Sequence, residues 1–147
     1  MNGVAKATPL LALLAALWSL PAGGARAQDA TAGETEFSRQ CVACHVIRTP
    51  SGETVAGRNA LTGPNLWGMV GARVGGVDGF RYGTGMAEMA ARGRTWDEAS
   101  IAAYLQDPTG WLQRELGDRR ARGKMAYMVR DAGQAADIAA YLATLGD

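Results

Sequence analysis

Apolar side chains recur at helical spacing in several short segments of this chain, and longer aperiodic stretches separate these segments. The last segment is the clearest, because Ile138, Tyr141 and Leu142 take the i, i+3 and i+4 positions of one helix face, and Leu145 continues the pattern. The same reading predicts helices at residues 31–44, 86–92, 95–107, 108–117 and 131–145.

Polar residues mark the ends of these predicted helices. Thr31 with Glu34, and Thr95 with Glu98, have the spacing of a capping box, in which each side chain accepts a hydrogen bond from the backbone N–H of the other residue. Asp107 precedes a proline and is expected to cap the helix that begins there.

Residues 46–94 have few periodic positions and hold many of the 20 glycines of the chain. Glycine adopts backbone conformations that other residues avoid, so this stretch is predicted to be mostly loop. No segment stands out with the alternating pattern of a half-buried strand. The chain is therefore predicted to be all-α, with short helices and long loops, and an apolar cofactor would help to fill such a loop-rich core.

The chain begins with the pattern of a secretory signal peptide. An apolar run from Leu10 to Leu20 follows Lys6, and small residues lie before a cleavage site after Ala27. The run is shorter than the ~20 residues that span a membrane, which disfavours the alternative of an uncleaved anchor. The expectation is a cleaved signal peptide at residues 1–27, export to the periplasm, and one mature domain at residues 28–147.

Composition limits the possible functions. A length of 147 residues corresponds to one domain with a leader, and a formal charge of +1 gives no basis for binding nucleic acid. The single histidine excludes sites that need two imidazoles. The two cysteines exclude a disulfide framework and a four-cysteine metal site.

Those two cysteines form the sequence Cys41-Val42-Ala43-Cys44-His45, which is the C-x-x-C-H signature of heme attachment. Two thiols at this spacing add to the two vinyl groups of heme, and the adjacent imidazole then binds the iron. A redox dithiol would follow a strand and open a helix, and a zinc site would need a further ligand. One covalent heme c is the expected cofactor.

The sixth iron ligand cannot be a second histidine, so the methionines are the candidates. The mature chain offers Met69, Met86, Met89, Met125 and Met128. Methionine is more often a core residue than a ligand, and spacing alone leaves the choice open. An irregular loop can carry a thioether to iron more readily than a packed helix face can.

Several ordered motifs resemble those of class I c-type cytochromes, and most closely bacterial cytochromes c2 of the longer type. The resemblance covers the chain from Gly33 onward. The motifs are Thr62-Gly63-Pro64-Asn65-Leu66-Trp67-Gly68, Phe80-Arg81-Tyr82-Gly83, Thr95-Trp96, Tyr104-Leu105-Gln106-Asp107-Pro108, Gly123-Lys124-Met125 and Ala140-Tyr141-Leu142. It implies the class I cytochrome c fold, with the chain wrapped around one covalently bound heme.

The resemblance also implies roles for particular residues. His45 matches the proximal ligand and Met125 the distal ligand, while the Pro64 carbonyl accepts from the histidine ring. Tyr82 and Trp96 match donors to a buried heme propionate.

Four further residues complete the pattern. Tyr104 matches a hydroxyl that reaches the ligand sulfur. Gly33, Phe37 and Tyr141 match the crossing of the first and last helices.

Two departures from the family pattern concern charge. Ala72 stands where the family usually has an arginine near the buried propionate, so either Arg73 reaches in or that counter-charge is missing. Arginines replace most lysines of the expected docking face. They are clustered before the ligand methionine, where they form either a solvated face or a steering patch: Arg114, Arg119, Arg120, Arg122 and Lys124.

The resemblance implies a monomeric one-electron carrier that is neither an enzyme nor inserted in the membrane. A cytochrome bc1 complex would be its donor, and a photosynthetic reaction centre or a terminal oxidase its acceptor. The alternatives are an enzyme or gas sensor with five-coordinate iron, which would bind carbon monoxide readily, and a subunit tethered by an uncleaved leader.

Overall fold

The computed structural model of this chain describes residue 3 and residues 28–146. The predicted signal peptide at residues 1–27, with its cleavage site, therefore falls outside the described residues, Gly3 aside. The described part contains these elements in chain order: α1 (Ala30–Gln40), β1 (Ile47–Arg48), β2 (Thr54–Ala56), α2 (Thr84–Ala91), α3 (Glu98–Gln106), α4 (Pro108–Leu116) and α5 (Ala132–Ala143).

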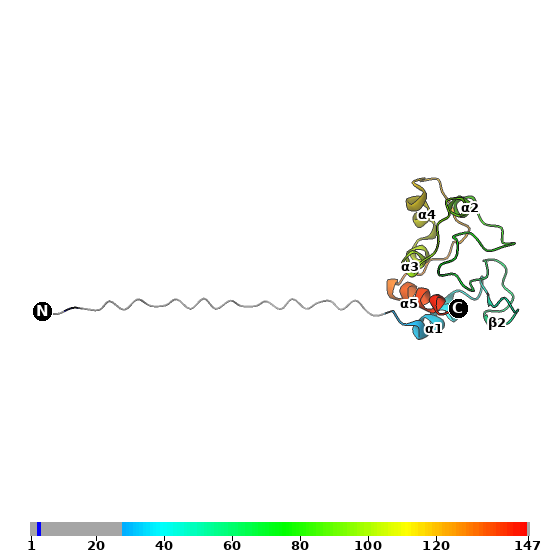
Figure 1. Ribbon diagram of the computed structural model, residues 1–147, viewed down its shortest axis with the longest axis horizontal. Helices are drawn as coiled ribbons and strands as arrows, with labels where there is room; N and C mark the ends of the chain where they lie inside the picture. The colour runs from blue at the N-terminus through cyan, green and yellow to red at the C-terminus, as the bar shows by residue number, and fades with distance from the viewer. Residues whose placement is uncertain (1–2, 4–27, 147) are drawn as a thin grey trace.

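The first and last helices pack directly against each other, and α3 lies against α5 (Figure 1). A side chain at Gly33 would place its Cβ 1.9 Å from the Asp137 carbonyl oxygen, so only glycine allows the helices to approach this closely. Nearby, the rings of Phe37 and Tyr141 lie 5.7 Å apart. The crossing expected at these residues is thus present.

The remaining helices extend from this crossing. Helix α4 packs against α3, and α2 packs against α4 (Figure 1). Leu112 of α4 and Ile138 of α5 are fully buried in one continuous apolar core. Burial of each such side chain contributes roughly 1.5–3 kcal/mol, so the core holds the helices although each is short.

The residues that cap the starts of α1 and α3 differ from the sequence predictions. Asp29, not Thr31, caps α1, because its carboxylate accepts from the backbone N–H groups of Thr31 and Ala32. The capping box of α3 consists of Asp97 and Ser100. Asp107 caps α4, as predicted, by accepting from the Gly110 N–H.

The cysteine motif is not helical, although the predicted helix at 31–44 included it. Helix α1 ends at Gln40, and the Cys44 and His45 N–H groups both donate to the Cys41 carbonyl oxygen. This turn changes the chain direction immediately after α1, so His45 does not lie along the continued axis of that helix.

The long segment between α1 and α2 is mostly loop, as predicted, but it contains a short antiparallel hairpin of β1 and β2. Strands of two and three residues are too short to show an alternating pattern. Asn65 supports the hairpin by bonding both backbone groups of Arg48. Within the described residues, no helix combines the length and apolar character needed to cross a membrane.

Candidate functional site

One cavity of about 570 Å³ brings together residues from both ends of the described chain. Its wall is largely apolar and includes Ile138 of α5 and Leu105 of α3. The residues singled out from the sequence all line this cavity: Cys41, Cys44, His45, Pro64, Tyr82, Trp96, Tyr104 and Met125. They come from four separate loops and helix α3, so tertiary packing alone assembles them.

His45 is held from two sides. Its Nδ1 lies 2.9 Å from the Pro64 carbonyl oxygen, to which it donates in the tautomer that leaves Nε2 with a free lone pair. The Gly63 backbone lies against the ring, since a Cβ there would be 2.3 Å from Cε1. Burial lowers the pKa of His45, and the bond to Pro64 only partly opposes this. The imidazole is therefore neutral and oriented, as a metal ligand must be.

The two cysteines lack the properties of a redox dithiol. Burial, and secondly the nearby Cys44, raises the pKa of Cys41 to about 12. A reactive dithiol needs a thiol whose pKa is lowered, typically at the start of a helix. Here the motif follows the end of α1, and both thiols line the cavity. They are placed to be attached to a group inside it.

An aromatic cluster forms another part of the wall. The Trp96 ring lies 5.3 Å from that of Tyr104 and 5.0 Å from that of Trp111. The Trp96 Nε1–H is buried and has no hydrogen-bond partner among the described residues. A buried donor normally has an acceptor. The unpaired Trp96 N–H therefore indicates that a molecule bound in the cavity supplies the acceptor, such as a carboxylate.

Two tyrosines, Tyr82 and Tyr104, also line the cavity. Burial, and secondly Tyr82, raises the pKa of Tyr104 to about 12, so its hydroxyl stays protonated. The Tyr82 hydroxyl accepts from the Val77 N–H at 3.3 Å, and burial raises its pKa despite this bond. Both hydroxyls keep a proton that they can donate.

The other methionines separate into two groups. Met89 and Met128 do not line the cavity, whereas Met69 and Met86 do. The latter two are buried members of the apolar core, and Met86 belongs to helix α2. Met125 lies in the irregular segment between α4 and α5 and is only partly buried.

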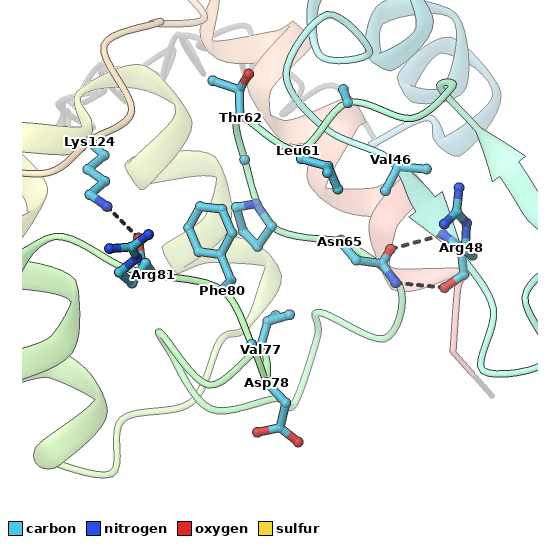
Figure 2. A pocket seen from close by; sticks show the side chains of 14 residues that line it. Val46, Arg48, Leu61, Thr62, Asn65, Val77, Asp78, Phe80, Arg81 and Lys124 are labelled. Carbon is cyan, nitrogen blue, oxygen red and sulfur yellow. Dashed lines mark hydrogen bonds between the residues drawn. The ribbon is translucent and has the colours of Figure 1, made fainter.

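A second cavity of about 650 Å³ adjoins the first (Figure 2). The two share wall residues: Thr62, Gly63, Pro64, Phe80 and Lys124. Figure 2 shows Lys124 on one side, where its Nζ donates to the Arg81 carbonyl oxygen at 2.5 Å. Lys124 therefore joins the loop of residues 77–82 to the segment that carries Met125.

Arg73 does not reach the cavity. Its side chain is exposed and its backbone pairs with Thr95. Among the described residues, the positively charged side chains that line the cavity are Arg39 and Lys124, and both are exposed. Of the two possibilities left by Ala72, the structure thus favours a cavity without a buried arginine.

Among the wall residues that sequence reasoning did not single out are Gln40 and Tyr127, which hydrogen-bond to each other. Tyr127 lies two residues from Met125, and Gln40 directly precedes Cys41. Their nearness to the motif residues was the available signal, but no pattern linked positions so far apart.

The residues present fit an iron porphyrin that carries carboxylate side chains. The cavity is apolar, and it offers two thiols, a neutral imidazole and a thioether. The unsatisfied Trp96 N–H provides a donor for a carboxylate.

No protein family model matches the chain. The chain is 51% identical to cytochrome c2 from Rhodovulum adriaticum over 118 residues, which cover 80% of this chain and 93% of that protein. It is 47% identical to cytochrome c2 from Cereibacter sphaeroides over 133 residues, 90% of each chain. The crystal structure of cytochrome c2 from Rhodobacter sphaeroides superposes with a TM-score of 0.77 at 45% identity, covering 81% of this chain and 97% of that one.

Proposed function

Since the chain belongs to the cytochrome c2 family of class I c-type cytochromes, we propose that it carries single electrons through one heme c ligated by His45 and Met125. The predicted all-α class I cytochrome c fold is confirmed by the likeness to cytochrome c2 structures. The chain holds one covalent heme c and is an electron carrier, not an enzyme.

The observation that carries the ligand assignment is the shared cavity. His45 and Met125 are 80 positions apart in the sequence, yet both line it together with the two cysteines. Met69 and Met86 are rivals by position, but both are packed within the apolar core. Met125 is free of regular structure, so its thioether can turn toward iron without disrupting a helix.

Each residue has a distinct task in this proposal. Cys41 and Cys44 anchor the group, while the Pro64 carbonyl holds the His45 ring so that Nε2 can bind iron. Met125 would supply the second protein ligand to the iron, which would leave no position for a substrate. The heme supplies a one-electron couple, and a methionine ligand together with burial raises its potential.

Trp96 and Tyr82 would donate to a buried heme propionate, and Tyr104 would reach the ligand sulfur. The wall near Trp96 provides neutral donors, whereas the cations of the wall, Arg39 and Lys124, are exposed. A cavity without a buried cation favours the oxidised iron and lowers the potential relative to one that holds an arginine.

The chain shuttles electrons between redox partners. We assign a cytochrome bc1 complex as the donor and a reaction centre or terminal oxidase as the acceptor, by family. The exposed arginines of the segment after α4, with Lys124 at the cavity, would steer a brief encounter with an acidic partner. The leader at residues 1–27 would deliver the protein to the periplasm, where residues 28–147 act as a monomer.

Optical spectra of the oxidised and reduced holoprotein test this function. We expect the weak near-infrared band of methionine-ligated ferric heme, abolished by Met125→Leu and retained in the matched control Met128→Leu. Carbon monoxide should bind wild-type ferrous iron slowly and the Met125→Leu protein readily. A wild-type spectrum without the band, with immediate carbon monoxide binding, would mean open iron and a sensor or enzyme instead of a carrier.

A further inference from the structure

Residues 123–128, here called the Met125 segment, form neither a helix nor a strand. Among the described residues, two hydrogen bonds tie it to the rest of the chain. Lys124 donates to the Arg81 carbonyl on one side of Met125, and the Tyr127 hydroxyl donates to Gln40 Oε1 at 2.9 Å on the other. These two tethers flank Met125, which also packs in part against the apolar core.

Gln40 is a fixed acceptor for this bond. Its Nε2 donates to Glu36 Oε2 at 2.7 Å and to Gln134 Oε1 at 3.1 Å. Both N–H groups of the amide are therefore used, and its oxygen is left to face Tyr127. The network joins α1 and α5 to the Met125 segment, so the tether ends on the most firmly packed pair of helices.

Tyr127 lies at the boundary between the cavity and the solvent. It lines the same cavity as Met125 and Cys44, yet 49% of its surface is exposed. A ring that is half in solvent gains little from burial, and its hydroxyl would be hydrated if the bond to Gln40 broke. The bond therefore matters more for where the segment sits than for whether the chain folds.

We propose that Tyr127, held by Gln40, is a positioning residue that keeps Met125 at the iron and the cavity rim closed to small external ligands. The proposal rests on the assignment of Met125 as the distal ligand. When the bond breaks, the Met125 segment opens more often, and a ligand that competes with the thioether gains access.

The test is a titration of the ferric holoprotein with imidazole, followed by loss of the near-infrared methionine band. A hydrogen bond of this kind changes an equilibrium by about fivefold. Tyr127→Phe keeps the ring and removes the hydroxyl, and it should strengthen apparent imidazole binding about fivefold while the melting temperature stays nearly constant. Gln106→Leu is the matched control, because that exposed glutamine bonds only within α3.

Gln40→Leu removes the partner, and the double variant measures the coupling. If the two residues act as one tether, the double variant should bind imidazole no more tightly than the stronger single variant. Additive effects, or no effect of Tyr127→Phe, would overturn the proposal. Amide hydrogen exchange gives a second readout: Tyr127→Phe should speed exchange in residues 123–128 and leave α1 and α5 unchanged.

The two hypotheses fail in different ways. A wild-type protein without the methionine band, or a band that survives Met125→Leu, would contradict the ligand assignment. A normal band that responds to Met125→Leu, together with unchanged imidazole affinity and exchange in Tyr127→Phe, would contradict only the role of Tyr127.

Discussion

The crossing of α1 and α5 and the Met125 segment are stabilised in different ways. At the crossing, the Phe37 and Ile138 side chains are fully buried, and Gly33 brings the two backbones into contact. In the Met125 segment, Tyr127 and Met128 are 49% and 45% exposed, and two side-chain hydrogen bonds connect the segment to its surroundings.

This difference separates the stability of the fold from the geometry of the site. Apolar burial holds the crossing and contributes several kcal/mol over a few side chains. Net hydrogen bonds contribute about 1 kcal/mol each, so the Met125 segment can open while the helices stay packed. His45 lies between these extremes, because a single turn connects it to the end of α1 but its ring is held by the Pro64 carbonyl of a loop.

The largest expected effect is that of Gly33→Ala. The new methyl group would overlap the Asp137 carbonyl and contact Tyr141 Cβ at 2.9 Å, which forces the helices apart. We expect a loss of about 3 kcal/mol or more of unfolding free energy, read as a fall in melting temperature by circular dichroism. Ser38→Ala, on the exposed face of the same helix, should change little. A melting temperature unchanged in Gly33→Ala would refute the close crossing.

Gly63→Ala should affect the site more than the fold. Its methyl group would overlap the His45 ring and tilt it away from the Pro64 carbonyl. A loss of about 1–2 kcal/mol is expected, with weaker axial ligation and faster carbon monoxide binding as the main changes. Thr62→Ala, at an exposed neighbour, is the control. If Gly63→Ala destabilised the protein as much as Gly33→Ala, the fold and the site would not be separable.

Asp97→Ala should have the smallest effect, and the effect should depend on pH. Hydrogen bonds from the Ser100 side chain and then its backbone hold the pKa of Asp97 below its usual value. Because the folded-state pKa is lowered, its contribution is complete above the usual carboxyl pKa and disappears as pH falls through the folded value. Melting temperatures of Asp97→Ala and wild type should therefore differ at neutral pH and converge in strong acid.

Asp97→Asn is the matched control for that series, since an amide oxygen can still cap α3 but does not titrate in this range. It should recover most of the stability at neutral pH, with a weaker pH dependence than wild type. An Asp97→Ala deficit that persisted unchanged in strong acid would contradict the role of the ionised carboxylate.

Much of the fold was predictable because its signals are local. The pattern at Ile138, Tyr141 and Leu142 identified α5, and Asp107 before Pro108 identified the start of α4. The errors were also local. Threonines at two helix starts competed with neighbouring aspartates, whose carboxylates are the better acceptors. The sequence did not predict the β1–β2 hairpin, because the residue that supports it, Asn65, lies outside it.

The candidate site was predictable as a set of residues but not as an arrangement. The motif and the family resemblance indicated the residues that line the cavity, including Trp96 and Tyr104. Neither indicated that Trp96 Nε1–H would lack a partner or that Arg73 would point to solvent.

By itself, the sequence determined the attachment chemistry and the family, because Cys41, Cys44 and His45 act through spacing that is fixed along the backbone. Only the tertiary structure decided which residues share the cavity with them and how they are held. Tyr127 and Gln40 are 87 positions apart, and the hydrogen bond between them exists because α1 and α5 pack together and carry the Met125 segment to the cavity rim. Contacts at such separations depend on how loops and helices pack as a whole, which no local pattern encodes.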